Sequence, residues 1–440
     1  MTNRKMLRSL SVLATSTVLV VAAACGGGGT SGSQTSSAPT AQGPVAEPTE
    51  PVTITFSSWI GSTKGMKKLY AKFKTEHPNI TVQFQDVPAE ESEKKLTTQV
   101  AGGNPPDAAY VDASNVATFA PRKALVELES TYMARSDVAK PDDFVDAFRA
   151  QTTVDGKMYG LPFDGESTGL YYRKDLFEAA GITAPPKTWE EFTAAAQKLT
   201  NPAKKQYGFQ VFAPEAEYYF YPWLWQNGGE LLSPDEKTAL FNNDKGKQAA
   251  DYYVGLAKYS SPDYLNSNSY DARIGFAQGQ IGMYMAGSWF AGTLNDEFPK
   301  IQDKWATAPL PSGTAGCKTT IAGDALVLFA KGKKQDAAWK WIEFLNKPEN
   351  MAEWTYKSEG TLLPPRTAVL ESPDLAKEKP VLKGFADLMK CGVNYNIANK
   401  QWPKVTEELN TQLGNAMFNK VTPAEALDNT AAEFEKLGSR

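Results

Sequence analysis

Alternating apolar and polar residues predict a β-strand over Val52–Phe56, where the first segment able to build a core begins. Apolar residues at helical spacing follow over 66–73, a second alternating run covers 80–84, and another helical pattern covers 90–100. A short apolar run then spans 107–111. This order of strand, helix, strand, helix, strand predicts a mainly parallel sheet covered by helices. In open sheets of this kind, ligands bind beyond the carboxyl ends of the strands.

Residues 1–50 have a different pattern. Basic residues precede an uncharged apolar stretch over residues 10–24, which is too short at its core to span a bilayer and is typical of a secretory signal peptide. We therefore predict that residues 1–24 are a signal peptide. Residues 25–50 are mostly Gly, Ser, Thr, Pro, Ala and Gln, a composition that favours a disordered tether.

Small residues stand directly before Cys25 and a run of glycines comes after it, which resembles a bacterial lipobox. The resemblance implies that Cys25 is acylated and becomes the new N-terminus, so that a lipid holds the protein to the cell membrane. Ordinary secretion with cleavage after Ala24 is the alternative.

Composition narrows the function classes. The chain has 440 residues, enough for two lobes with separate cores, and its 50 acidic against 46 basic residues argue against a nucleic-acid partner. Its single histidine, His77, precedes Pro78 where a helix should end, so local capping is favoured over nucleophile chemistry that depends on histidine. We expect no metal and no cofactor, since no metal-type spacing is present.

Cysteine usage fits an exported protein. With Cys25 assigned to the lipid, Cys317 and Cys391 remain as an even pair, which predicts a disulfide between them. Two unrelated buried thiols are the alternative.

Several short motifs occur in a characteristic order along the chain. They are Asn104-Pro-Pro-Asp107, Leu170-Tyr-Tyr-Arg-Lys-Asp-Leu176, Pro186-Lys-Thr-Trp-Glu-Glu-Phe192, Gly287-Ser-Trp289, Leu363-Pro-Pro-Arg366 and Pro423-Ala-Glu-Ala-Leu427. Each is weak alone. In this order, after a lipobox, they resemble the extracellular solute-binding proteins of bacterial ATP-binding-cassette importers, in the maltose/oligosaccharide-binding branch.

The resemblance implies an α/β, two-lobe periplasmic-binding-protein-like fold of type II, in which each lobe is a mainly parallel sheet flanked by helices and a hinge joins the lobes. We expect lobe 1 to comprise residues 51–162 plus 318–362, and lobe 2 to comprise 163–317 plus 363–440. The chain crosses between the lobes more than once in this fold, so both lobes are discontinuous in sequence.

The implied function is capture of a sugar, a di- or oligosaccharide, by hinged closure and its delivery to a membrane permease. The protein would be an extracytoplasmic monomer that meets the membrane only through its lipid, and it would not be an enzyme. The same fold binding glycerol phosphate or a polyamine is one alternative. A secreted glycosidase acting through two carboxylates is another.

Sugar binding needs aromatic rings for the C–H faces and carboxylates or arginine for the hydroxyls. By the family pattern, Trp289 matches a tryptophan that stacks on sugar and Glu166 a glutamate that binds hydroxyls. Asp112 comes after the third strand at its carboxyl end, where an Asx cap is its alternative role. The complete set of candidate ligand-binding residues is Trp289, Glu166, Asp112, Asp164, Tyr218, Tyr219, Arg366, Trp59 and Trp402, with Asp324 as a weaker addition.

Alternative roles stay open for several of these residues. A core or hinge position is the alternative for Trp289. Arg366 could bind vicinal hydroxyls or form a structural salt bridge across the hinge.

Overall fold

The computed structural model describes residues 43–212, 219–262, 272–357, 360–395, 397, 399 and 401–438, and the structural statements below concern these residues. The predicted signal peptide and Cys25 lie outside them, as does Tyr218. In the described part of the chain, no helix is long and apolar enough to cross a membrane.

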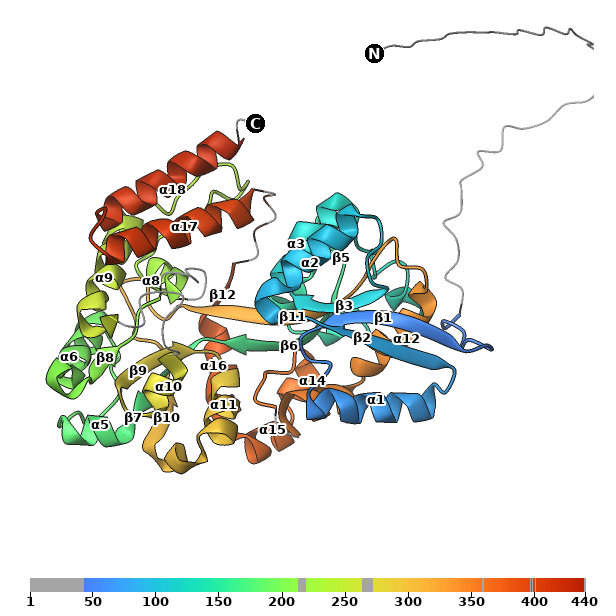
Figure 1. Ribbon diagram of the computed structural model, residues 1–440, viewed down its shortest axis with the longest axis horizontal. Coiled ribbons are helices and arrows are strands. Elements are labelled where there is room, and N and C mark those ends of the chain that lie inside the picture. Colours follow the sequence, from blue (N-terminus) through green and yellow to red (C-terminus); the bar gives the residue numbers. More distant parts are fainter. Residues whose placement is uncertain are drawn as a thin grey trace, which may run out of the picture. The chain divides into compact units, whose positions relative to one another are not determined.

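A six-stranded sheet organises the first lobe (Figure 1). Its strands are β1 (Val52–Ser58), β2 (Ile80–Asp86), β3 (Ala108–Asp112), β6 (Leu161–Ser167), β11 (Thr319–Leu328) and β12 (Gly392–Asn394). β1 pairs in parallel with β2 and β3, whereas β11 is antiparallel to β3 and β6 and parallel to β12. The main helices of this lobe are α1 (Lys64–Glu76), α2 (Ala89–Ala101), α3 (Ser114–Phe119) and α12 (Gln335–Leu345). All five elements predicted over residues 52–111 are confirmed, with boundaries that differ by at most a few residues.

A four-stranded sheet organises the second lobe, in the order β10 (Trp305–Ala308), β7 (Gly169–Arg173), β9 (Ile281–Ala286) and β8 (Tyr207–Phe209). β7 is antiparallel to both β10 and β9, and only β8 and β9 are parallel. The prediction of a mainly parallel sheet in each lobe is therefore wrong for this lobe. The prediction failed because the strand-helix-strand pattern on which it rested occurs only over residues 52–111. β7 comes directly after β6, so no helical crossover of the kind that joins parallel strands leads into the second sheet there.

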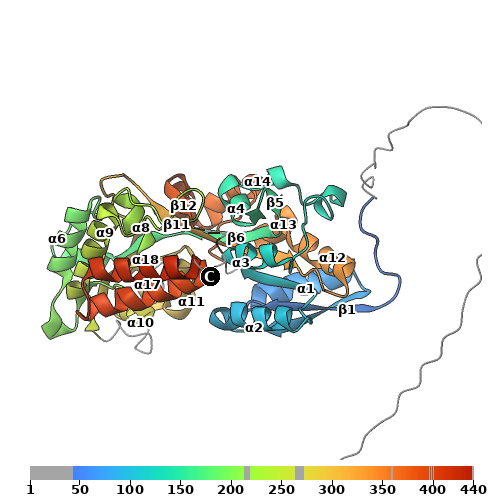
Figure 2. The same cartoon turned by 90° about the horizontal axis from the view of Figure 1, so that it is seen from above.

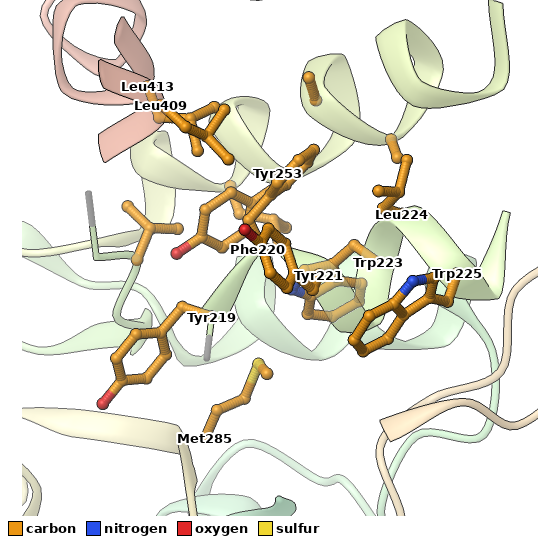
Figure 3. Close-up of a cluster of buried hydrophobic side chains, with 14 of the residues drawn as sticks. Tyr219, Phe220, Tyr221, Trp223, Leu224, Trp225, Tyr253, Met285, Leu409 and Leu413 are labelled. Atoms are coloured by element: carbon orange, nitrogen blue, oxygen red, sulfur yellow. The ribbon is translucent and has the colours of Figure 1, made fainter. Parts of the chain in front are cut away.

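The second lobe has a large aromatic core (Figure 3). α8 (Tyr221–Gln226) contributes Trp223 and Trp225, and α9 (Asp244–Gly255) contributes Tyr253. The C-terminal helices α17 (Trp402–Met417) and α18 (Pro423–Gly438) cover this core with residues such as Leu409. The remaining elements are β4 (Thr153–Val154), β5 (Lys157–Met158), α4 (Asp146–Gln151), α5 (Lys174–Ala179), α6 (Trp189–Leu199), α10 (Ala272–Ala277), α11 (Trp289–Glu297), α13 (Pro348–Ala352), α14 (Thr367–Leu370), α15 (Pro373–Glu378) and α16 (Pro380–Leu388).

The packed body begins before residue 51. Val45 is buried in the core of the large sheet, and the Glu47 carboxylate contacts His77 Nδ1 at 2.9 Å and Lys340 Nζ at 3.1 Å. The described end of the predicted tether is thus part of the fold. His77 also closes α1, since its backbone N–H donates to Phe73 O, which confirms the predicted capping role. The lobe boundaries given above stay a prediction.

Candidate functional site

Two strands of the large sheet meet end to end along one edge of β11. Ile321 pairs with Ser167 of β6 on one side and with Asn394 of β12 on the other, and Asp324 pairs with Asp164 of β6 and with Asp112 of β3. Because a strand has only two edges, β3 and β12 both lie on the edge opposite β6. β3 runs antiparallel to β11 and β12 runs parallel to it, so their carboxyl ends converge beside Ala322 and Gly323 (Figure 1).

A cavity of about 620 Å³ opens where the segments after β3 and β12 leave this edge of the sheet. On one side it is lined by α2 and the α3 helix that comes after β3. On the other it is lined by the segment after β12 and by one face of α17. Both views show the start of α17 directed toward α2 and α3 (Figures 1 and 2). The lining residues are Glu93, Ser114, Thr118, Tyr395, Ile397, Trp402, Pro403, Thr406, Glu407, Asn410 and Thr411.

Three carboxyl groups occupy one rung of the sheet beside this cavity. Asp324 stands between Asp112 and Asp164 in the register, and Asp112 accepts a hydrogen bond from the Ser114 amide at 2.8 Å. That bond is the predicted Asx cap, and it joins the rung to a residue that lines the cavity. Burial raises the pKa of Asp112, and burial together with the Asp112 charge raises the pKa of Glu93.

The pKa values of two carboxyl groups in this rung are raised, which favours a protonated carboxyl. The Tyr110 hydroxyl lies 2.6 Å from Asp324 Oδ2 and 3.0 Å from Asp164 Oδ2, and the Trp354 indole N–H donates to Asp164. Tyr110 has a single hydroxyl proton, so it either shares that proton between the two carboxyls or accepts a hydrogen bond from a protonated one. Burial raises the pKa of Asp164 to about 6. Burial and the charge of Asp164 raise the pKa of Asp324 well above its ordinary value.

Aromatic rings surround these carboxyl groups. Trp59 comes after β1 and packs on Tyr110 with ring centroids 4.6 Å apart, and Trp354 stacks on Phe163 at 5.8 Å. Trp59 and Trp354 are both half-buried. The arrangement can bind a ligand that offers hydrogen-bond donors to the carboxyls and a flat apolar face to the rings.

Other predicted residues lie on different elements. Glu166 is half-buried in β6, where it pairs with Ala322 at the point at which β3 and β12 converge. Trp289 begins α11, is half-buried and packs on Phe290 with centroids 5.6 Å apart. Tyr219 is buried and stacks on Phe212 at 4.4 Å, and Figure 3 draws it near Met285. Of the predicted set, Trp402 lines the cavity and Asp112, Asp164 and Trp59 belong to the rung and its aromatic surround.

Arg366 is not part of this site. Its guanidinium Nη2 contacts Asp143 Oδ2 at 2.7 Å and Val138 O at 2.9 Å, Nη1 donates to Asn346 O at 3.2 Å, and the side chain is 7% exposed. Its ion pair with Asp143 and its hydrogen bonds to two carbonyls favour the alternative of a structural salt bridge, and ligand binding by Arg366 stays a prediction.

Sequence reasoning missed Tyr110, Trp354, Glu93 and Tyr395. Tyr110 could have been found, since it lies two residues before Asp112 on the same face of a predicted strand. Trp354 carries no such signal, since only the packing of the chain after α13 brings it to Asp164.

The predicted disulfide is confirmed: Cys317 and Cys391 are bonded, with their Cα atoms 5.4 Å apart. Cys391 directly precedes β12.

A two-lobed α/β body with a ligand-sized cavity where strand ends converge defines the class of binding proteins that close on a solute. Residues 58–352 match the family described as bacterial extracellular solute-binding proteins, and the chain belongs to that family. A Brucella abortus chain known only as a binding protein is 31% identical over 296 residues, which are 66% of this chain and 70% of that one.

Two further likenesses extend over more of the chain. The lactose-binding protein of Rhizobium radiobacter is 25% identical over 395 residues, 84% of this chain and 88% of its own. The crystal structure of a Thermotoga lettingae solute-binding protein bound to α-D-tagatose superposes with a TM-score of 0.79 at 26% identity, covering 88% of this chain and all of that one. The family assignment and the two-lobe fold predicted from the sequence are thereby confirmed.

Proposed function

We propose that this protein is the sugar-binding component of an ATP-binding-cassette importer, and that it captures an uncharged di- or oligosaccharide and hands it to a membrane permease. The observation that carries the proposal is the cavity itself. Carboxyl, hydroxyl and amide groups line it together with Tyr395 and Trp402, beside the rung of Asp112, Asp324 and Asp164.

Sugars match this chemistry. Their hydroxyls donate to carboxylates in charge-assisted hydrogen bonds, and their C–H faces pack on aromatic rings. A volume of about 620 Å³ falls within the range of small-molecule sites, so the cavity is large enough for a sugar ligand. A relative that binds lactose and a structural neighbour that binds tagatose support the same class of cargo.

Charge argues against anionic cargo. In the described part of the chain, the charged residues that line the cavity, Glu93 and Glu407, are acidic, and so is the neighbouring rung. A phosphate or sugar acid would meet only like charge and no cationic donor. Glycerol phosphate is therefore disfavoured among the alternatives. A polyamine is the second candidate, because carboxylates beside aromatic rings also suit an ammonium group.

Binding would work by closure. A ligand that contacts both the first-lobe rung and the α17 face binds the closed arrangement more tightly and so increases its population. Micromolar affinity corresponds to about −8 kcal/mol, which a few charge-assisted hydrogen bonds and stacked rings can supply after the cost of closure.

The family implies an extracytoplasmic location. Attachment through a lipid on Cys25 and a monomeric state are further parts of the proposal. Palmitate labelling of the producing cells tests the anchor: the intact chain should incorporate label and partition with membranes, and Cys25→Ala should do neither.

Thermal unfolding of the full chain against a panel of solutes tests the cargo. The panel contains tagatose, lactose, maltotriose, glycerol 3-phosphate and spermidine. A ligand at 100 times its Kd adds about 2.7 kcal/mol, which raises Tm by a few degrees in a protein of this size. We expect a saccharide to do so, and we expect Asp112→Ala to reduce the shift.

Each other outcome has a meaning. A response to spermidine alone would show that the cargo is a polyamine. A response to glycerol 3-phosphate alone would overturn the argument that the acidic lining excludes anionic cargo. Chromatography of the incubated saccharide completes the test, since appearance of shorter products would identify a glycosidase.

A further inference from the structure

The rung of three acids has no cation to balance it. Asp112, Asp324 and Asp164 stand side by side on β3, β11 and β6, and no lysine or arginine in the described part of the chain forms an ion pair with them. Beyond the rung, burial and the charge of Asp112 raise the pKa of Glu93, whereas Arg122 lowers it. Neighbouring carboxylates without a cation disfavour each other's charge, so binding a proton is the simplest way to reduce that charge.

Asp324 and Asp164 share the Tyr110 hydroxyl and contact each other. The hydroxyl oxygen lies 2.6 Å from Asp324 Oδ2 and 3.0 Å from Asp164 Oδ2, and the two carboxyl groups form a hydrogen bond. A hydrogen bond between two carboxyl groups needs a proton on one of them, because an ionised carboxylate can only accept. Burial raises the pKa of both acids. Beyond that, their mutual hydrogen bond raises the pKa of Asp324 and lowers that of Asp164, the signs expected when Asp324 is the donor.

Access to the two acids differs. Asp164 is 1% exposed and accepts a hydrogen bond from the Trp354 indole N–H, so it lies at the inner end of the rung. Asp324 and Asp112 are half-buried, and the Asp112 carboxylate is joined to the cavity lining through the Ser114 amide. A ligand in the cavity therefore meets the rung at Asp112 and Asp324 rather than at Asp164.

We propose that saccharide binding is linked to a proton held between Asp324 and Asp164. While Asp324 donates that proton to Asp164, it is not free to act as a carboxylate toward a ligand. A sugar hydroxyl that donates to Asp324 favours its ionised form, so the proton leaves the pair for the solvent as the ligand binds. Affinity should therefore increase as the pH rises. The linkage to ligand rests on the proposed function, whereas the proton in the free protein does not.

Titration calorimetry of the full chain with lactose and maltotriose tests the linkage. In two buffers of different ionisation enthalpy at pH 7, the parent chain should release about one proton per saccharide bound. Between pH 6 and pH 9 its Kd should fall about tenfold or more. A Kd that is constant over this range, with no proton released, would overturn the proposal.

Two variants distinguish the pair from a general effect of acidity. In Asp164→Asn the neighbouring charge is gone and Asp324 ionises at lower pH, so proton release at pH 7 and the dependence of Kd on pH should both disappear. Tyr110→Phe removes a hydrogen bond that lowers the pKa of Asp324, so the improvement in Kd should move to higher pH. Asp428→Asn, which changes an acid of α18 paired with Lys247, is the control and should behave like the parent chain. Proton release that persists in Asp164→Asn would place the proton elsewhere and contradict the proposal.

Carbon NMR of the aspartate carboxyl groups tests the proton without ligand and without relying on a variant that folds poorly. The Asp324 signal, assigned by its loss in Asp324→Asn, should remain that of a protonated acid at pH 7 and become that of a carboxylate on saturation with the saccharide. An Asp324 signal that titrates near pH 4 in the free parent chain would overturn the proposal. If Asp324 is protonated at pH 7 but neither saccharide binds, the proposed function fails for these sugars and the proton in the free protein stands.

Discussion

The two walls of the cavity are built in different ways. The first wall ends in the rung of Asp112, Asp324 and Asp164, whose places are set by the register of β3, β11 and β6 in the middle of a sheet. The second wall consists of Tyr395, Ile397 and one face of α17. It is held by a three-residue edge strand, a disulfide, a helix and the packing of Tyr395 and Ile397 on the aromatic core of the second lobe. The first wall supplies polar groups in fixed places, whereas the order of the second depends on a few separate anchors.

This difference has consequences for substitutions. A change in the first wall should alter contacts with ligand or the charge of the rung while leaving the fold in place. A change at an anchor of the second wall should alter order and stability first and affinity as a result. Four substitutions separate these cases.

Trp402→Ala should have the largest effect, on the second wall. Trp402 is 7% exposed and packs against Phe241 and Phe434, so removing its ring should cost about 3–5 kcal/mol of unfolding free energy. Denaturant unfolding measures this, with Trp402→Phe as the control that keeps part of the contact. Unchanged stability with lost affinity would show that Trp402 stacks on the ligand and does not anchor the second wall, which would contradict the difference drawn between the two walls.

Asp164→Asn tests the proton in the first wall. The pKa of Asp164 is raised from 3.8 to about 6 in the folded chain, so its contribution to stability is fully present below pH 4 and is lost as the pH rises through 6. Asparagine imitates the protonated acid. Between pH 4 and pH 7, the unfolding free energy of the variant should therefore fall by roughly 2–3 kcal/mol less than that of the parent chain.

The measurement is Tm as a function of pH. Above pH 6, the Tm of the variant should be a few degrees higher than that of the parent chain. Asp428→Asn is the control, because Lys247 and Asn242 lower the pKa of that carboxyl and its loss should act in the opposite direction. Parallel curves for the parent chain and Asp164→Asn would show that the pKa of Asp164 is not raised in the folded chain.

Asp112→Ala should weaken saccharide binding by about tenfold to a hundredfold, the usual worth of a hydrogen bond to a charged group. Titration calorimetry with the saccharide that responds in the panel measures it. Asp112→Asn keeps the cap on the Ser114 amide and isolates the charge. If the alanine variant loses stability but no affinity, Asp112 is a cap alone.

Asn410→Ala should have the smallest effect. Asn410 lines the cavity from α17, four residues after Thr406, and we expect its loss to weaken binding of a trisaccharide about threefold to tenfold and to leave a monosaccharide unaffected. The comparison of maltotriose with tagatose measures it, and Thr411→Ala on the same face is the matched variant. Equal losses for both sugars would place Asn410 at the first sugar unit instead.

Much of the architecture was predictable from local patterns. Alternation over Val52–Phe56 and helical spacing over 66–73 identify elements whose side-chain periodicity is imposed by the core they cover. Asp112 was found because the carboxyl end of a strand is a position that a linear pattern reveals. The antiparallel second sheet was missed, since nothing local in Gly169–Arg173 states which strands will lie beside it.

For the candidate site too, some residues were predictable from the sequence and others were not. Arg366 was chosen for its position at an expected crossing and Trp402 as a weaker aromatic candidate, yet Arg366 pairs with Asp143 and Trp402 lines the cavity. The difference lies in which partner each side chain reaches in space.

By itself, the sequence determined the family, the alternating elements of the first lobe, the capping of α1 by His77 and the pairing of two cysteines. Each of these depends on residues near one another in the chain or on simple parity. Only the tertiary structure decided that Asp112, Asp164 and Asp324 share one rung, that Tyr110 joins two of them, and that β3 and β12 converge on β11. Those facts depend on register between strands far apart in sequence, and register is set by how whole faces pack rather than by any local pattern.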